Sequence, residues 1–221
     1  MDNRALVVLS GGQDSTTCLY WAIDRFGSAG VESLTFDYGQ RHRIELEAAS
    51  KVAAHAGVPN LVLPIDTFEA LGGSALTDPA VGVPQSPGND ALPATFVPGR
   101  NLVFLTFAAA YAWQRGIEQL VTGVAQTDYS GYPDCRRDTI DALEKTLALG
   151  LERRITIHTP LMNLTKKETV LLAKELNAIE AMALTHTCYN GVRPPCGECA
   201  ACILRATGFA EAGLEDPLTA T

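Results

Sequence analysis

Residues Ser10–Ser15, with the sequence SGGQDS, follow the apolar run Ala5–Leu9 and precede a helical pattern that extends to Phe26. The apolar residues of that pattern recur at the spacing of one helix face. A glycine pair therefore stands where a buried strand turns into a helix. Such a junction presents free backbone N–H groups and the positive end of a helix dipole, so it favours a phosphate group. The glycines let the backbone approach the anion closely.

This loop differs from two other common nucleotide-binding motifs. It has neither the G-x-x-x-x-G-K-[ST] pattern of a Walker A loop nor the G-x-G-x-x-G spacing of a dinucleotide-binding turn. It resembles the pyrophosphate loop of the PP-loop ATPases, which split ATP between the α and β phosphates. A glycine turn in an ordinary strand–helix unit is the alternative. The resemblance implies that ATP contacts Val8, Leu9, Ser10, Gly11, Gly12, Gln13, Asp14, Ser15, Thr16, Thr17 and Cys18.

Strand-like runs alternate with helical patterns along most of the chain. Strands are expected at Ala5–Leu9, Val31–Phe36, Leu61–Leu63, Gln119–Thr122 and Ile155–His158, and helices at Ser15–Phe26, Ile44–Ala56, Asn101–Arg115, Arg136–Leu149 and Thr165–Leu176. This alternation predicts an α/β fold, a Rossmann-like parallel sheet with helices on both faces. The loops that follow the strands then share one edge of the sheet. We therefore expect Ser10–Ser15, Asp37–Gln40 and Gly123–Arg137 to face one pocket.

Length and composition limit the classes of protein that this chain can represent. Its 221 residues suit one large α/β domain, residues 1–185, with a small C-terminal segment, residues 186–221. The net charge of −8 argues against nucleic acid as the main partner. The longest apolar run, Leu102–Trp113, is too short to span a membrane. The first residues run directly into a predicted strand, so we expect no signal peptide and a cytoplasmic location.

Four cysteines near the C-terminus have the spacing of a metal site. Cys188, Cys196, Cys199 and Cys202 form the pattern C-x7-C-x2-C-x2-C. Four thiolates suit a closed tetrahedral zinc site, with Zn–S distances of about 2.3 Å. Four protein ligands leave no open coordination position, which favours a structural role. An iron–sulfur cluster is the first alternative, because four cysteines also hold such clusters. Two disulfides are the second, which a cytosolic location disfavours.

The loop Asp128–Arg137 combines acids, guanidinium groups and aromatic rings. Such a mixture suits a flat, anionic small molecule, which an aromatic ring can stack on and an arginine can pair with. A solvated loop is the alternative. Cys135 in this loop is expected near the pocket, whereas Cys18 is expected in the core.

Several single residues have two interpretations each. Arg100, just before a helix, can reach a phosphate or a carboxylate, or lie on the surface. Asp37, at the end of the second strand, can hold the ribose or amine of ATP, or cap a turn. Lys166 opens a helix, where a cation opposes the dipole, so either an anion lies nearby or the lysine is solvated. The histidines are interpreted as structural, with His42 the nearest to the pocket.

The segment from Asp66 to Arg100 contains five prolines and five glycines and shows little periodicity. A stretch of this kind in a compact domain is usually an active-site cover or a mobile loop.

Taken together, the motifs resemble those of the 7-cyano-7-deazaguanine synthases, the QueC family. The resemblance rests on SGGQDSTT (10–17), DYGQRH (37–42), VPGRN (97–101), DYSGYPDCR (128–136), PLMNLTKKE (160–168) and the cysteine cluster with Arg205. It implies a ligase that converts 7-carboxy-7-deazaguanine, ammonia and ATP into the nitrile 7-cyano-7-deazaguanine, for queuosine. It also implies structural zinc, Mg²⁺ near Asp14, and a homodimer that acts on small molecules, without nucleic acid or membrane.

The same resemblance implies roles for individual residues. Catalytic roles fall to Asp14, Ser15, Arg100, Asp134 and Arg136, and substrate contacts to Tyr129, Tyr132, Asp134 and Arg136. Two other functions remain open at this point. One is a PP-loop enzyme that thiolates tRNA, and the other is a zinc-stabilised nucleotide-binding module without catalysis.

Overall fold

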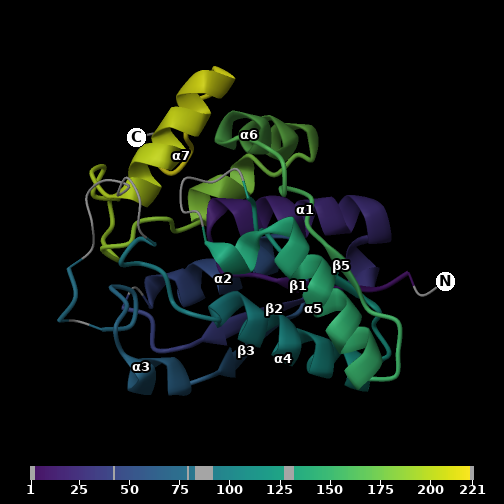
Figure 1. The fold of residues 1–221 in the computed structure, drawn as a ribbon. Coiled ribbons are helices and arrows are strands. Elements are labelled where there is room, and N and C mark those ends of the chain that lie inside the picture. The colour runs from purple at the N-terminus through teal and green to yellow at the C-terminus, as the bar shows by residue number, and fades with distance from the viewer. Residues whose placement is uncertain (1–2, 42, 79, 83–91, 127–131, 220–221) are drawn as a thin grey trace.

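The computed structural model describes residues 3–41, 43–78, 80–82, 92–126 and 132–219. Its centre is a sheet of five parallel strands in the order β3-β2-β1-β4-β5 (Figure 1). The strands are β1 (Ala5–Val8), β2 (Val31–Asp37), β3 (Asn60–Pro64), β4 (Gln119–Val121) and β5 (Thr156–His158). Ala5 pairs with Val31 on one side and with Gln119 on the other. The chain thus winds outward from β1 in both directions, which opens a crevice at the carboxyl ends of β1 and β4.

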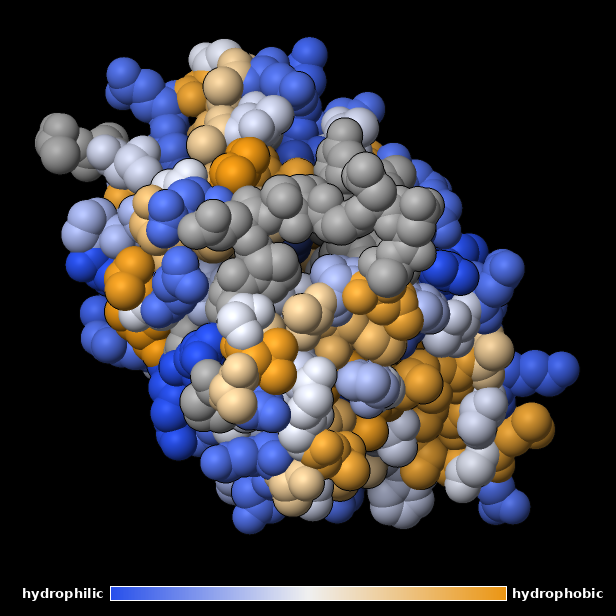
Figure 2. Space-filling model, turned by 60° about the vertical axis from the view of Figure 1, so that its left-hand side comes forward, coloured by the Kyte–Doolittle hydropathy of each residue, from blue (hydrophilic) through white to orange (hydrophobic). Residues whose placement is uncertain are grey.

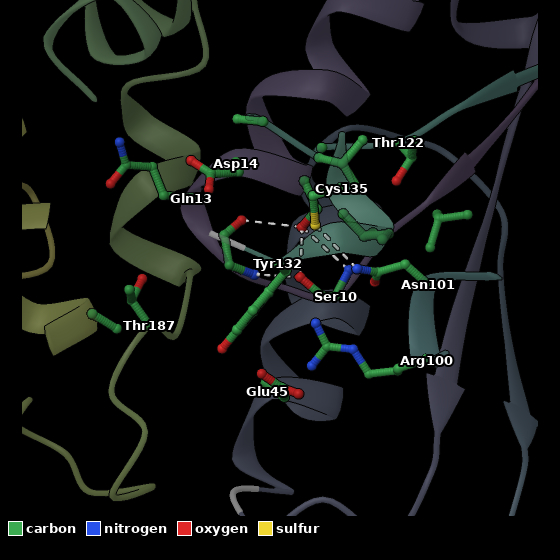
Figure 3. A pocket seen from close by; sticks show the side chains of 18 of the residues that line it. Ser10, Gln13, Asp14, Glu45, Arg100, Asn101, Thr122, Tyr132, Cys135 and Thr187 are labelled. Carbon is green, nitrogen blue, oxygen red and sulfur yellow. Dashed lines mark hydrogen bonds between the residues drawn. The ribbon is translucent and has the colours of Figure 1, made fainter. Parts of the chain in front are cut away.

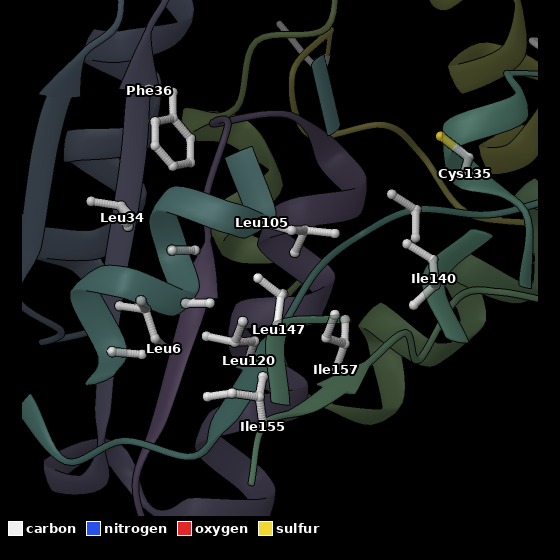
Figure 4. Close-up of a cluster of buried hydrophobic side chains, with 14 of the residues drawn as sticks. Leu6, Leu34, Phe36, Leu105, Leu120, Cys135, Ile140, Leu147, Ile155 and Ile157 are labelled. Atoms are coloured by element: carbon white, nitrogen blue, oxygen red, sulfur yellow. The ribbon is translucent and has the colours of Figure 1, made fainter. Parts of the chain in front are cut away.

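Two layers of helices cover the sheet, because successive side chains of a strand point to opposite faces. Leu6 packs on one face with buried residues of α4 (Arg100–Arg115) and α5 (Arg137–Gly150), as Figure 4 shows. Val7 packs on the other face with buried residues of α1 (Gln13–Phe26) and α2 (Ile44–His55). The predicted α/β fold, a parallel sheet with helices on both faces, is confirmed.

The C-terminal part adds a helical unit beside α1. It consists of α6 (Lys166–Glu175), a 3-10 turn at Glu180–Leu184 and α7 (Ala200–Ala212). Val170, Met182 and Phe209 form a small apolar cluster that joins these three elements. Thr165 and Glu168 form a capping box at the start of α6, in which each side chain pairs with the other residue's backbone N–H. The division of the chain at residues 185 and 186 stays a prediction.

Two helices lie where no helix is expected from the sequence. The first is α3 (Thr67–Leu71), which lies within the segment interpreted as an irregular loop. It forms because Phe68 is buried against Tyr38 and Phe104. The second is α7, whose first turn contains the metal-type cysteines. Among the described residues, no helix combines the length and apolar character that a membrane crossing requires.

Candidate functional site

The loop Ser10–Ser15 is closed by its two serine side chains. The Ser15 hydroxyl donates to the carbonyl of Gly12 at 3.2 Å and accepts from the Ser10 N–H at 3.2 Å. The hydroxyls of Ser10 and Ser15 lie 3.0 Å apart. A Cβ on Gly123, after β4, would lie 3.1 Å from the Ser15 nitrogen, so glycine permits this close approach. The start of α1 is thereby held at the crevice, where its dipole favours an anion.

A cavity of about 280 Å³ lies in front of this loop (Figure 3). Its lining comes from the ends of β1, β2 and β4, the start of α4, the turn Pro133–Cys135 and the start of α6. The lining includes Ser10, Tyr38, Gly123 and Cys135. The prediction that the three strand-end loops face one pocket is therefore confirmed, as is the expected place of Cys135.

Lys166 and Asp14 form an ion pair in the wall of this cavity. The Lys166 ammonium lies 2.6 Å from Asp14 Oδ2, and the two side chains are 18% and 29% exposed. Asp14 Oδ1 is buried and has no hydrogen-bond partner among the described residues. The anion expected near the start of this helix is therefore Asp14. Lys166 thus brings its ammonium group to the Ser10–Ser15 loop from a position 152 residues after Asp14.

Arg100 supplies a second positive charge at the start of α4. It is half-buried in the cavity wall, its Nη1 donates to the Tyr38 hydroxyl at 3.4 Å, and its guanidinium lies 5.7 Å from the Tyr38 ring centre. Burial raises the pKa of Tyr38 to about 12, so this hydroxyl stays protonated at neutral pH. Arg100 and Glu45 both extend into the lower part of the cavity in Figure 3. This region can bind a ligand that carries both an anionic group and N–H donors.

Some residues predicted to contact ligands lie outside the cavity lining. Asp134 is buried, and its Oδ2 accepts a hydrogen bond from the Asn101 N–H at 3.1 Å, so it positions the start of α4 instead. Arg136 is exposed at the start of α5. Asp37 pairs with Arg43. Tyr129 and His42 lie outside the described residues.

Part of the predicted ATP-binding run is also turned away from the cavity. Thr16, Thr17 and Cys18 are fully buried, because these positions of α1 face the sheet and the neighbouring elements. The Thr17 hydroxyl donates to the Gln13 carbonyl, and the Cys18 thiol donates to the Thr122 carbonyl. Cys18 is thus the core thiol expected from the sequence. The run lines the cavity through Val8, Leu9, Ser10, Gly12, Gln13, Asp14 and Ser15.

The segment after the 3-10 turn contributes residues that sequence reasoning did not place in the site. His186, Thr187 and Tyr189 line the cavity. His186 was interpreted as structural, and its ring is indeed buried, with Nε2 2.9 Å from the Cys188 carbonyl. No motif signals this segment, because its approach to the loop depends on the packing of α7.

The four C-terminal cysteines converge on one point. All four sulfur atoms lie within 4.8 Å of one another, and those of Cys196 and Cys202 are 3.9 Å apart. A tetrahedron with metal–sulfur bonds of about 2.3 Å has edges of about 3.8 Å, so the cluster fits such a metal. A hydrogen bond from Cys202 is the main cause that lowers the pKa of the Cys199 thiol, to about 4. Backbone N–H groups of Cys196 and Cys199 also point at neighbouring sulfurs.

Comparison with known families gives a match over most of the chain. The sequence model of the family described as "Queuosine biosynthesis protein QueC" matches residues 4–213. The 7-cyano-7-deazaguanine synthase of Chromobacterium violaceum is 66% identical over 98% of this chain and 93% of that protein. The enzyme of the same name from Laribacter hongkongensis is 64% identical over 97% of this chain and 93% of that protein.

Solved structures are similar at the level of the fold. A protein described as a predicted subunit of a tRNA methyltransferase from Methanocaldococcus jannaschii matches with a TM-score of 0.50 and 20% identity, over 78% of this chain and 74% of that one. The U34-tRNA thiolase NcsA of Methanococcus maripaludis matches with a TM-score of 0.53 and 16% identity, over 94% of this chain and 65% of that one. At these identities the likeness concerns the fold alone, and it agrees with the predicted PP-loop type.

Proposed function

The chain belongs to the QueC family of queuosine biosynthesis proteins, and we propose that it converts 7-carboxy-7-deazaguanine and ammonia into 7-cyano-7-deazaguanine at the expense of ATP. The observation that carries this proposal is the family match over residues 4–213, together with near-complete relatives named 7-cyano-7-deazaguanine synthase. The cavity in front of the Ser10–Ser15 loop supports this proposal. It contains hydrogen-bond donors that suit the phosphates of ATP and, next to them, a region that suits a polar anion.

The chemistry requires that the carboxylate be activated twice. A carboxylate oxygen is a poor leaving group, so it first attacks the α-phosphate of ATP, which forms an acyl-adenylate and releases pyrophosphate. Ammonia then displaces AMP and gives the amide. Activation of the amide oxygen by ATP and loss of that oxygen with the nucleotide give the nitrile. No covalent bond to the protein is needed, so positioning and electrostatics supply the rate enhancement.

The residues of the cavity suit these steps. The N–H groups at the start of α1 and the hydroxyls of Ser10 and Ser15 bind the leaving pyrophosphate. Lys166, held by Asp14 at 2.6 Å, neutralises charge on the phosphates. Arg100 pairs with the substrate carboxylate beside Tyr38, and Tyr132 limits the same region, with its hydroxyl 2.7 Å from that of Thr95. These groups are fixed before the reaction, so they need little reorganisation.

Two metal ions belong to the proposal. The buried Oδ1 of Asp14, which has no partner among the described residues, fits a Mg²⁺ ligand. Mg²⁺ bound there would neutralise charge on the ATP phosphates. Zinc fits the four-cysteine cluster, where all four positions are taken by sulfur. Its role is therefore to hold the C-terminal segment in place.

We also propose a cytoplasmic homodimer that acts on free small molecules and not on nucleic acid. The net charge of −8 supports the last point. None of the six cysteines forms a disulfide, which is typical of a reducing compartment. Apolar side chains gather on part of the face in Figure 2, and Phe107 and Trp113 of α4 are 45% and 47% exposed. Light scattering of the purified protein tests the dimer.

The test of the activity is mass spectrometry of the product formed from 7-carboxy-7-deazaguanine, ATP and ammonium. The nitrile is the expected product, and its absence would refute the proposal. In the same assay Asp14→Ala is expected to abolish turnover, while its zinc content and circular dichroism stay as in the wild type. A variant that has lost zinc or is unfolded would show that Asp14 has a structural role.

A further inference from the structure

We propose that Arg205 is a positioning residue for the phosphate-binding loop, and that it acts through the segment 185–187, which it holds against that loop. This inference rests on the proposed function, because it takes Ser10–Ser15 to be the loop that binds the phosphates of ATP. Arg205 lies on α7, beside the four-cysteine cluster and far along the chain from the loop, and part of its side chain lines the cavity.

Every N–H donor of Arg205 has a partner, and the side chain is 4% exposed. Nε and Nη2 donate to the two carboxylate oxygens of Asp216 at 2.6 and 2.7 Å. Nη1 donates to the hydroxyls of Thr185 and Thr187 at 2.7 and 3.0 Å, and Nη2 also donates to the Met182 carbonyl at 3.1 Å. A guanidinium has five N–H donors in a planar fork, whereas a lysine has three. Lysine therefore cannot hold this set of partners.

The segment held in this way contacts the loop directly. The backbone N–H of His186, between the two threonines, donates to the Gly11 carbonyl at 2.9 Å. A peptide group is planar and trans, so the Gly11 carbonyl and the Gly12 N–H point in opposite directions. With this carbonyl fixed towards His186, the Gly12 N–H is aimed at the Ser10 hydroxyl, 3.4 Å away in the cavity wall. Gly11 itself has a φ of +84° and fits closely against Glu45 and Ala49 of α2.

The four-cysteine cluster fixes the other end of this connection. Cys199 is the residue directly before α7, and Cys202 lies in its first turn, three residues before Arg205. Residues three apart lie on the same side of a helix. The cluster therefore sets the position of Arg205, Arg205 sets residues 185–187, and these residues set the peptide between Gly11 and Gly12.

The experiment measures the dissociation constant of MgATP by calorimetry, without the second substrate, for purified variants. Arg205→Lys keeps the charge, and we expect its dissociation constant to rise about tenfold, which corresponds to about 1.4 kcal/mol. Its metal content should be that of the wild type, and amide hydrogen exchange of residues 10–15 should become faster. Asp216→Asn is the matched control, measured at a temperature where circular dichroism shows it folded. It removes the negative charge beside Arg205 but leaves the Thr185 and Thr187 hydroxyls and the Met182 carbonyl. Its dissociation constant should stay within about twofold, well inside the 1.4 kcal/mol that tenfold represents.

A second pair of variants decides the question if Arg205→Lys does not fold. Thr185 is buried outside the cavity lining, so it has no direct route to ATP. Thr185→Val removes the hydroxyl that Arg205 holds, and Thr185→Ser keeps it. The inference is supported if Thr185→Val binds MgATP more weakly than the wild type while Thr185→Ser does not. It is overturned if the two variants bind MgATP equally well. Wild-type protein that does not bind MgATP would refute the proposed function instead, which separates the two failures.

Discussion

Replacing Asp216 by asparagine is expected to destabilise the protein strongly, although this residue lies in the C-terminal tail. Its carboxylate accepts two hydrogen bonds from Arg205, at 2.6 and 2.7 Å, and the two side chains are 10% and 4% exposed. Removing one partner leaves a buried guanidinium without its counter-charge, which costs about 3–5 kcal/mol. For a chain of this size about 1 kcal/mol lowers the melting temperature by about 2–4 °C, so we expect a loss of about 6–20 °C.

The assay is urea unfolding followed by circular dichroism, with thermal unfolding as a second measurement, both in excess zinc. Asp141→Asn is the control, because its pair with Arg137 at 2.8 Å joins side chains that are 60% and 38% exposed. An exposed pair four residues apart on a helix contributes only about 0.3–0.5 kcal/mol. If Asp216→Asn costs no more than Asp141→Asn, the reasoning from the burial of this pair is refuted.

Four other predictions concern the site and the core. Lys166→Gln should lower kcat/KM, measured by pyrophosphate release, by about 10²–10³, which is the usual cost of a lost electrostatic stabiliser. Lys167→Gln is the control and should match the wild type, because Lys167 is exposed. If both variants lose the same fraction of kcat/KM, Lys166 has no special role in the site. Cys199→Ser should reduce metal content and melting temperature, and a stable, metal-replete variant would exclude this cysteine as a ligand. Burial lowers the pKa of His158 from 6.5, so the unfolded state binds more protons below about pH 6.5 and the free energy of unfolding falls there as the pH decreases. His158→Gln should weaken this pH dependence in urea unfolding measured from pH 7 to 5.5. The same pH dependence in the variant and the wild type would contradict the prediction. Leu120→Ala should lower the free energy of unfolding by about 2–5 kcal/mol, because Leu120 is fully buried beneath α4 and α5. A loss below about 1 kcal/mol would show that neighbouring side chains fill the space left by the leucine.

The sequence was sufficient to predict the sheet and the turn from β1 into α1 at Ser10–Ser15. Runs such as Ala5–Leu9 are apolar throughout because a central parallel strand is buried on both faces. The helices between them follow the spacing of one apolar face, and their bounds differ from the expected ones by one or two residues. α7 was not predicted, because its first turn carries metal-type cysteines and its apolar residues give no clear periodicity.

The other half of the site depends on contacts between residues far apart in the chain. Lys166 was recognised as a cation at an unfavourable helix position, but only the fold shows that its partner is Asp14. Asp134 lies in a loop whose composition suits a ligand site, yet its carboxylate accepts a hydrogen bond from a backbone N–H at the start of α4. His186 reaches the loop because Arg205 holds its neighbours. Local patterns specify elements, whereas these positions are set by packing between elements.

The late position of Arg205 in the chain has a consequence for synthesis of the protein. The Ser10–Ser15 loop leaves the ribosome well before Arg205, whose side chain holds Thr185 and Thr187 beside that loop. The nascent chain can form the first strands during translation and still has no finished nucleotide site. A polypeptide that stops before Arg205 would therefore contain every strand of the sheet and lack the side chain that holds residues 185–187 against the loop.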